Sequence, residues 1–268
     1  MSPLADQDWR PRLVALDIDG TLVDRNGFLP DFVADAVGQV VQAGVPVVLS
    51  TGRSWHGTRS LFDELQLPPG PTVCSNGAVV VRYPPQEIIK AITFDPRPVI
   101  TQVEEFAPGT LIAVEEIGIG YRLNDRFPGD EDLTGELIIE DAEQLSSRPV
   151  TRVILRDATR SEEEFLALAR HLGMHGITYF IGWGSWLDIA PDGVNKATAL
   201  AEVAAGFGVA AADVLAFGDG RNDIEMLRWA GRGVAMGDAP EDVKAAADDV
   251  TKTIDDGGPA AELRAWFG

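Results

Sequence analysis

The sequence contains little cysteine and few basic residues. Its one cysteine, Cys74, cannot form an intrachain disulfide, so we expect a reducing compartment, the cytoplasm. Cys74 stands in an apolar run, which favours a small core residue over a nucleophile. The 22 Lys and Arg residues face 42 Asp and Glu residues, giving a formal charge of −20. Such an acidic chain repels phosphate backbones and anionic lipid, so we expect no nucleic acid and no membrane as partners.

Long hydrophobic runs are absent as well. No apolar stretch reaches the ~18 residues that span a bilayer, and residues 1–12 show no apolar signal-peptide centre. Hydrophobic residues make up 45% and charged residues 24%, which is ordinary for a globular protein and excludes extended disorder. The 268 residues are enough for one large domain or two smaller ones.

Strands and helices alternate towards both ends of the chain. Residues 13–16, 45–49 and 72–75 are apolar runs typical of strands buried on both faces, and residues 213–217 and 233–236 repeat the pattern. Helices are predicted over 31–43, 54–66, 195–207, a segment ending at 229, 240–247 and 258–267. This alternation predicts an α/β fold with a Rossmann-like, doubly wound parallel sheet.

The middle of the chain has a different pattern, with shorter apolar runs that often alternate. One helix is predicted over 161–172, where Ser161 and Glu164 form a capping-box pair. We interpret this part as an inserted α+β cap domain over residues 84–187, and residues 1–83 and 188–268 as the core domain. The runs that suggest strands in the insert are 87–94, 111–116, 119–123, 137–140 and 153–156.

Polar clusters follow the predicted core strands. Asp17–Thr21, Thr51–Arg53 and Asp219–Asp223 come directly after strands, and Lys196 opens a helix. Each cluster alone is more simply a turn, a helix cap or a solvated side chain. Because ligands gather at the carboxyl ends of parallel strands, we expect the four clusters to meet in one pocket.

Such a pocket has a definite chemistry. Asp17, Asp19, Asp219 and Asp223 would repel one another unless a cation neutralised them, and oxygen ligands of this kind suit Mg²⁺. An ionised carboxylate beside Lys196 can attack phosphorus. A second carboxylate, two residues further on, can transfer the proton of the leaving alcohol. The hydroxyl and amides of the other clusters can bind phosphoryl oxygens.

The motifs resemble those of the haloacid dehalogenase-like superfamily of phosphohydrolases. Asp17–Thr21 matches its first motif, Ser50–Arg53 the second, Gly193–Lys196 the third and Gly218–Asp223 the last. Ser75–Ala78 is similar to the Cof-type branch, in which a type IIB α/β cap lies between the second and third motifs. The resemblance covers the core, whereas the cap agrees only in position and size.

The resemblance implies a role for each matching carboxylate. Asp17 would be the nucleophile that becomes an aspartyl-phosphate, and Asp19 the general acid and base, with its backbone carbonyl on Mg²⁺. Asp219 would ligate the metal and Asp223 would support it directly or through water. An Asp at the position of Asp19 marks phosphatases and mutases, and it argues against dehalogenases, phosphonatases and P-type ATPases.

The resemblance also implies the residues that hold the substrate. Thr51 and Lys196 would hold the phosphoryl group and count with Asp17 and Asp19 as catalytic. The full set of predicted phosphate or substrate contacts is Thr51, Gly52, Arg53, Asn76, Lys196 and Asn222. For Arg53, pairing with a core carboxylate or the cap is an alternative.

Two interpretations are possible for each of three aromatic residues. Trp183 and Trp186, where the insert rejoins the core, suit either stacking on a sugar or base or packing within the cap. His56 suits either a substrate contact or a helix surface.

The resemblance implies a Mg²⁺-dependent phosphatase for small phosphorylated metabolites, with sugar phosphates as the leading class. We expect a monomer or a small homo-oligomer. Three alternatives stay open: a phosphomannomutase-like phosphomutase, a specialist phosphatase for sucrose phosphate or mannosyl-phosphoglycerate, and a non-catalytic binding protein with the same fold. A mutase would need basic cap residues for a bisphosphate; the candidates are Arg122, Arg126, Arg148, Arg152 and Arg156.

Overall fold

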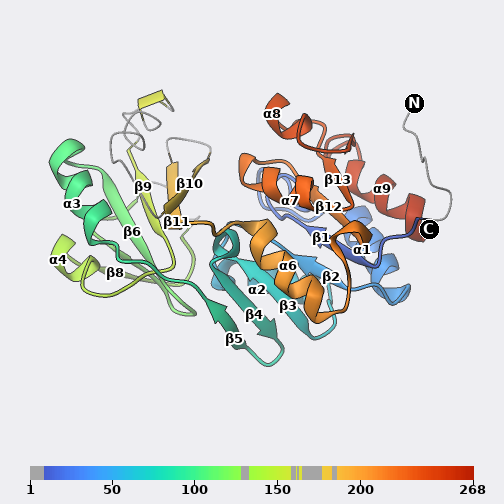
Figure 1. The fold of residues 1–268 in the computed structure, drawn as a ribbon, viewed down its shortest axis with the longest axis horizontal. Coiled ribbons are helices and arrows are strands. Elements are labelled where there is room, and N and C mark those ends of the chain that lie inside the picture. The colour runs from blue at the N-terminus through green and yellow to red at the C-terminus, as the bar shows by residue number, and fades with distance from the viewer. Residues whose placement is uncertain (1–8, 128–132, 158–160, 162, 165–176, 183–185) are drawn as a thin grey trace.

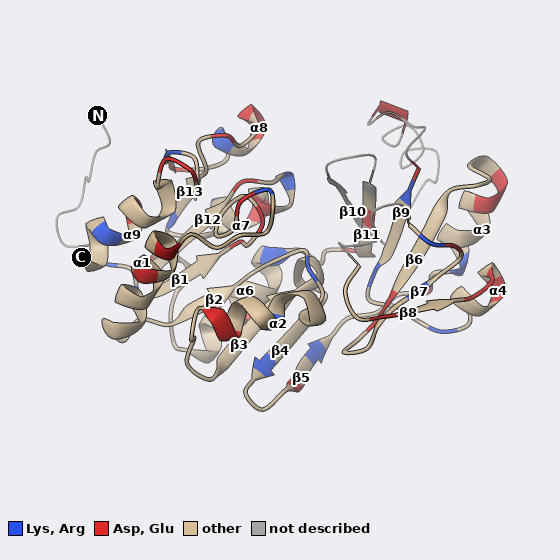
Figure 2. Cartoon of the chain, turned by 180° about the vertical axis from the view of Figure 1, so that it is seen from behind, with Lys and Arg blue, Asp and Glu red and all other residues tan. Residues whose placement is uncertain are grey.

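The computed structural model has two parts that lie side by side (Figure 1). One part is a parallel sheet with helices on both faces, and the other is a second sheet with helices on its outer side. Asp and Glu occur in both parts (Figure 2). The structure describes residues 9–127, 133–157, 161, 163–164, 177–182 and 186–268. No helix among these residues combines the length and the apolar character that crossing a membrane requires.

The core sheet has five parallel strands in the order β14-β13-β12-β1-β2. Its central strand, β1, lies between β12 and β2, and all four of its residues are buried. The order doubles back around β1, which confirms the predicted doubly wound α/β core. The strands are β1 (Leu13–Leu16), β2 (Val47–Leu49), β12 (Val214–Gly218), β13 (Arg232–Ala235) and β14 (Asp249–Val250).

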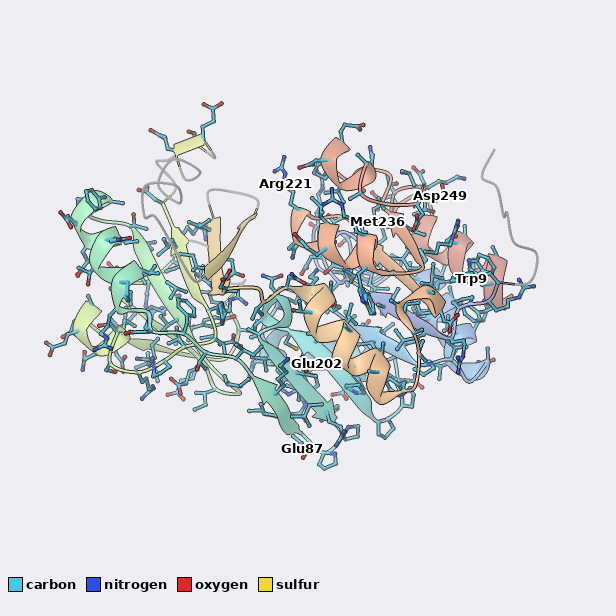
Figure 3. The ribbon with its side chains drawn as sticks, viewed as in Figure 1. Trp9, Glu87, Glu202, Arg221, Met236 and Asp249 are labelled. Carbon is cyan, nitrogen blue, oxygen red and sulfur yellow. The ribbon has the colours of Figure 1, made fainter. Side chains whose placement is uncertain are left out.

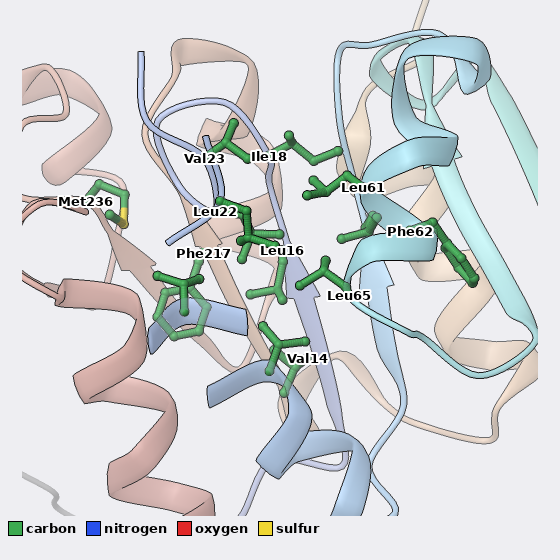
Figure 4. Close-up of a cluster of buried hydrophobic side chains, with 14 of the residues drawn as sticks. Val14, Leu16, Ile18, Leu22, Val23, Leu61, Phe62, Leu65, Phe217 and Met236 are labelled. Atoms are coloured by element: carbon green, nitrogen blue, oxygen red, sulfur yellow. The ribbon is translucent and has the colours of Figure 1, made fainter. Parts of the chain in front are cut away.

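Both faces of this sheet are covered, as β1 shows. Val14 and Leu16 point into one apolar cluster, which Figure 4 shows with Phe217 and Leu61. Leu13, on the opposite face of the same strand, packs into a second cluster. Successive strand residues face opposite ways, so a strand covered on both sides must be apolar throughout. The covering helices are α1 (Asp31–Gln42), α2 (Trp55–Glu64), α6 (Lys196–Gly206), α7 (Ile224–Trp229), α8 (Glu241–Lys244) and α9 (Gly258–Phe267).

The third strand departs from the prediction. β3 (Gly70–Cys74) touches the parallel sheet through one bridge, Ser50 to Val73, but pairs along its length with the antiparallel β4 (Val79–Tyr83). β5 (Glu87–Ala91) completes this separate three-stranded sheet. The tight turn of η1 (Ser75–Gly77) reverses the chain directly after β3 and brings β4 back alongside it. Cys74, at the end of β3, is buried as expected, and burial raises the pKa of its thiol.

The cap contains a six-stranded sheet in the order β10-β11-β9-β6-β7-β8, antiparallel except between β7 and β8. Among the described residues of the cap, α3 and α4 lie on this sheet, and α3 packs Val99, Ile100 and Val103 against it. This confirms an inserted α+β cap. Its elements are α3 (Arg97–Phe106), β6 (Leu111–Glu116), β7 (Gly120–Leu123), β8 (Glu136–Ile139), α4 (Ala142–Leu145), β9 (Val153–Arg156), β10 (Ile177–Gly182) and β11 (Trp186–Pro191).

The sequence did not predict the helices α3 and α4 or the strands β4, β10, β11 and β14. The predicted helix 161–172 lies mostly outside the described residues, although Ser161 and Glu164 exchange the expected capping hydrogen bonds. The domain limits 83/84 and 187/188 stay a prediction: β5 lies beyond the first but pairs with β4, and β11 spans the second.

We expect Leu16→Ala to destabilise the protein by about 2–5 kcal/mol, because it opens a cavity in the fully buried centre of the sheet. Phe28→Ala is the control, since Phe28 is 61% exposed and its loss should cost under about 0.5 kcal/mol. Urea unfolding of both variants measures the difference. Equal losses would contradict this account of the core.

Candidate active site

The ends of the core strands bring the predicted clusters together. The amide of Asp17, which follows β1, donates to the carbonyl of Phe217 in β12, so the two strand ends lie side by side. Thr51 follows β2, and Lys196 is the first residue of α6. Asn195 caps that helix by accepting the amide of Thr198. Segments from four distant parts of the sequence therefore share one edge of the sheet.

Lys196 is the centre of the site. Its Nζ donates to Oδ1 of Asp17 at 2.6 Å and to Oδ1 of Asp223 at 2.5 Å, and Lys196 and Asp223 are completely buried. A buried ammonium is strongly unfavourable unless carboxylates surround it. Burial lowers the pKa of Lys196, but Asp17 and Asp223 outweigh it and raise that pKa above its ordinary value. Lys196 is therefore a permanent positive charge beside Asp17.

Three carboxylates form a group that can hold a metal ion. Oxygens of Asp17, Asp219 and Asp223 lie within 4.8 Å of one another. The second oxygen of Asp223 accepts the amides of Asp219 and Gly220, which fixes its position. Gly20 has φ +75°, and a Cβ there would lie 2.3 Å from Oδ2 of Asp219, so only glycine allows this approach. Hard oxygen donors of this kind suit Mg²⁺.

The pKa values of these carboxylates reflect an excess of negative charge. Burial, and then the charge of Asp223, raise the pKa of Asp17 to about 7. Burial, and then the charges of Asp17 and Asp223, raise the pKa of Asp219 to about 9. One lysine does not balance three carboxylates, so the group fits a divalent cation.

Asp19 stands apart from this group. Its side chain is 61% exposed and forms a two-pronged ion pair with Arg53, with Nε to Oδ2 at 2.9 Å and Nη2 to Oδ1 at 2.5 Å. The structure thus brings together three of the four carboxylates predicted to bind metal. The predicted role of the Asp19 carbonyl stays a prediction. An exposed, oriented carboxylate is suited to exchange protons with a bound molecule.

The remaining predicted contacts form a second cluster. Thr51 is fully buried, and its hydroxyl oxygen accepts the amide of Arg53 at 3.0 Å. Asn222 donates to Oδ1 of Asn76 at 2.9 Å. A Cβ on Gly52 would lie 3.2 Å from Asn76 Oδ1, so Gly52 lets the two strand-end loops touch. All the predicted substrate contacts therefore lie beside the carboxylates or in the loops that adjoin them.

Other residues take different places. His56 is exposed on α2, which favours the helix-surface interpretation. Arg221, within the last motif, lies at the edge of the core on the side of the cap (Figure 3), and its Nε donates to Oδ2 of Asp242. Trp183 and the side chain of Trp186 lie outside the described residues.

The sequence did not predict that cap residues contact these loops, and it named Arg152 only as a candidate cation for a bisphosphate. Arg152 and Asp188 are buried where the cap meets the core, and Arg152 donates to the Gly52 carbonyl. Nothing in a single sequence distinguished them from ordinary strand residues. Only a buried charge on an otherwise apolar strand, as in Leu187-Asp188-Ile189, could have drawn attention.

With this geometry in place, comparison with known proteins identifies the class. Residues 14–263 match the family of haloacid dehalogenase-like hydrolases, and the chain belongs to that family. It is a phosphatase of the Cof-type branch with a subclass IIB cap.

Three similar proteins illustrate the branch. The 5-amino-6-(5-phospho-D-ribitylamino)uracil phosphatase YitU of Bacillus subtilis is 28% identical over 97% of this chain and 99% of its own. The pyridoxal phosphate phosphatase YbhA of Escherichia coli is 28% identical over 88% of this chain and 92% of its own. The structure of the subclass IIB sugar phosphatase BT4131 superposes with a TM-score of 0.82, at 25% identity, over 95% of this chain and 98% of that one.

We expect a divalent cation to stabilise the protein more as pH rises. The folded-state pKa values of Asp17 and Asp219 exceed the unfolded value of 3.8, so without metal their contribution to stability is complete below about pH 4. That contribution is lost as pH rises through about 7 for Asp17 and about 9 for Asp219. In EDTA, Tm should therefore fall between pH 5 and pH 9.

Thermal unfolding with and without MgCl₂ across this pH range checks the expectation. Mg²⁺ should raise Tm more at pH 8 than at pH 5, because protons compete for the same oxygens. Asp219→Asn should reduce both the pH slope and the effect of Mg²⁺. An effect of Mg²⁺ that is independent of pH and of this variant would contradict the assignment.

Proposed function

We propose that the protein is a Mg²⁺-dependent phosphatase that hydrolyses small phosphate monoesters through an aspartyl-phosphate on Asp17. The observation that carries the proposal is the buried triad of Lys196 with Asp17 and Asp223, next to the carboxylate of Asp219. Lys196 favours the ionised form of Asp17, and the three carboxylates leave net negative charge for a cation to balance. Bound there by Asp17, Asp219 and Asp223, Mg²⁺ would neutralise charge on the phosphoryl oxygens.

The nucleophile and the proton donor are held by different partners. Lys196 fixes one oxygen of Asp17 and favours its ionised form, so the other oxygen is available to attack phosphorus. Arg53 orients Asp19 by holding both of its oxygens. One oxygen would leave Arg53 and take a proton from solvent, and Asp19 would then give that proton to the leaving alcohol. Asp19 would then take a proton from the water that hydrolyses the aspartyl-phosphate.

The phosphoryl group would be held by the loops around Asp17. The Thr51 hydroxyl can donate a hydrogen bond outward, because its oxygen already accepts the Arg53 amide. The Lys196 ammonium supplies positive charge beside Asp17. Asn222 lies next to Gly52 in the loop that contains Thr51. These donors are fixed before the substrate arrives, which is the condition for electrostatic stabilisation of a phosphoryl transition state.

We propose sugar phosphates as the leading substrate class. The support is the sugar phosphatase that shares the core and the cap, together with YitU, whose named substrate carries its phosphate on a ribityl chain. Among described cap residues, Arg122 pairs with Glu116 and Glu140, and Arg148 with Glu116. Cations engaged in this way are not free for the second phosphate of a mutase, so we favour hydrolysis.

Release of phosphate from a panel of phosphorylated metabolites, with Mg²⁺ or EDTA, tests the function. We expect turnover of one or more sugar phosphates without an added bisphosphate, and none in EDTA. A requirement for a bisphosphate would indicate a mutase. A folded protein that is inactive on the whole panel and on p-nitrophenyl phosphate would indicate a non-catalytic binding protein.

Asp17→Asn should abolish phosphate release from p-nitrophenyl phosphate, because an amide is not a nucleophile for phosphorus. Asp35→Asn, on the outer helix α1, is the matched control and should retain full activity. Circular dichroism checks the fold of both. Activity retained in Asp17→Asn would place the nucleophile elsewhere.

Asp19→Asn should slow turnover of a sugar phosphate by roughly 10²–10⁴-fold, the usual value of general acid–base catalysis, and leave the fold intact. The loss should be smaller for p-nitrophenyl phosphate, whose leaving group needs little protonation. Steady-state kinetics on both substrates measures the two losses. Near-normal turnover of both would contradict the role in proton transfer.

Lys196→Ala should weaken phosphate binding and lower kcat, and it should also lower Tm because Asp17 and Asp223 stay buried without their cation. Product inhibition and thermal unfolding measure the two effects. If the variant has the kinetics of the wild-type protein, the third motif has been assigned to the wrong residues.

A further inference from the structure

Four neighbouring strands of the cap carry a row of buried polar side chains that faces the core. The row consists of Asp188 in β11, Arg152 directly before β9, Glu115 in β6 and Tyr121 in β7. Glu115 lies opposite Tyr121, and its amide donates to the carbonyl of Arg152, so these three are level across the sheet. We call these four residues the docking row. All four are buried.

The docking row contacts the loops of the active site. Glu115 Oε2 accepts the hydroxyl of Ser75 at 2.6 Å, and Asp188 Oδ2 accepts the side-chain amide (Nδ2) of Asn76 at 2.9 Å. Tyr121 is hydrogen-bonded to the side chain of Ser54. Each contact ends within a few residues of Thr51 along the chain or in the turn that touches it.

The turn that the row holds is itself strained and rests on the phosphate loop. Ser75 has φ +50° and Asn76 φ +53°, a left-handed conformation that is unfavourable for residues with a side chain. The amide of Ser75 donates to the carbonyl of Arg53, and that of Asn76 to the carbonyl of Thr51. The two carboxylates of the docking row therefore stabilise a turn that braces the loop from one side.

Arg152 reaches the loop itself. Its Nη1 donates to the Gly52 carbonyl at 2.6 Å, and its Nη2 pairs with Asp188 Oδ2 at 2.9 Å. The arginine side chain is 6% exposed and that of Asp188 10%. Hydrogen bonds from a charged, desolvated donor are stronger than neutral ones. Gly52 is the middle residue of the loop, between the Thr51 hydroxyl and the Arg53 that orients Asp19.

We propose that Arg152 is a positioning residue for phosphoryl transfer: the cap inserts its guanidinium to fix the Gly52 peptide and so orient the phosphate-binding loop. This inference rests on the proposed assignment of Thr51–Arg53 to the phosphoryl group. A glycine peptide with no side chain has few restraints of its own. An external donor on its carbonyl limits rotation of the peptide, which also carries the Arg53 amide bound to Thr51 Oγ1.

Arg152 thereby links cap docking to the phosphate site. The donor is on the cap and the acceptor is on the core, so the hydrogen bond exists only while the cap rests on the core as it does here. A merely structural role for the Arg152–Asp188 pair would affect stability alone. A positioning role also affects the affinity for the phosphoryl group, and these two effects can be separated.

The test compares Arg152→Met with the double variant R152M/D188N. R152M should lower Tm, because it leaves the Asp188 carboxylate buried without its cation. D188N removes that charge and keeps an acceptor for Asn76, so the double variant should recover most of the lost Tm. The affinity for inorganic phosphate is measured as product inhibition of p-nitrophenyl phosphate hydrolysis. In both variants it should be about tenfold weaker than in the wild-type protein.

Two further variants complete the design. Arg152→Lys keeps a positive charge beside Asp188, so its Tm should stay close to that of the wild-type protein. It lacks the forked guanidinium that binds Asp188 and Gly52 together, so its phosphate affinity should be intermediate. Arg148→Met is the matched control, since Arg148 is a cap arginine, 55% exposed, that pairs with Glu116. Its phosphate affinity, KM and kcat should not change.

The outcomes are distinct. An unchanged phosphate inhibition constant in R152M/D188N, or its recovery together with Tm, would overturn the proposal and leave Arg152 a structural residue. An equal loss in R148M would also overturn it. If R152M does not fold, R152K and the double variant decide by the same readout. If the wild-type protein neither hydrolyses p-nitrophenyl phosphate nor binds phosphate, the proposed function itself is refuted.

Discussion

One buried ammonium group determines the arrangement of the site. The Lys196 Nζ holds Asp17 from the end of β1 and Asp223 from the loop after β12, so it joins the start of α6 to two strands of the sheet. Removing the charge of Lys196 would leave two buried carboxylates without their cation. The position of α6, the ionisation of Asp17 and the space for a cation beside Asp219 all depend on these two contacts.

The site has two parts that are held in place in different ways. Asp17 and Asp219 directly follow buried strands, whereas Lys196 opens α6 and Asp223 lies in the turn after β12; Asp17, Lys196 and Asp223 are buried. Thr51, Gly52 and Arg53 lie on a loop that relies on neighbours: a strained turn on one side and the docking row of the cap on the other. This division suits an enzyme in which the chemistry is common to a family and the cap selects the substrate.

The sequence predicted the parts of the site that follow strands. Asp17 and Asp219 come directly after apolar runs, and strand ends in a parallel sheet meet at one edge, so their proximity follows from periodicity alone. The same reasoning was right only in part for β3, which meets the parallel sheet at one bridge but pairs along its length with β4 after the reversal at Ser75–Gly77. It missed α3 as well, where alternating runs on both sides suggested strands only.

The sequence by itself determined the fold class, the order of the motifs and the residue types of the chemistry, since these depend on local patterns that any copy of the chain carries. Tertiary structure alone decided which charges meet. It separated Asp19 from the other carboxylates by pairing it with Arg53, and it placed Arg152 against Gly52, a hundred residues away. Such pairings depend on how the two sheets are oriented in space, and no local pattern encodes that orientation.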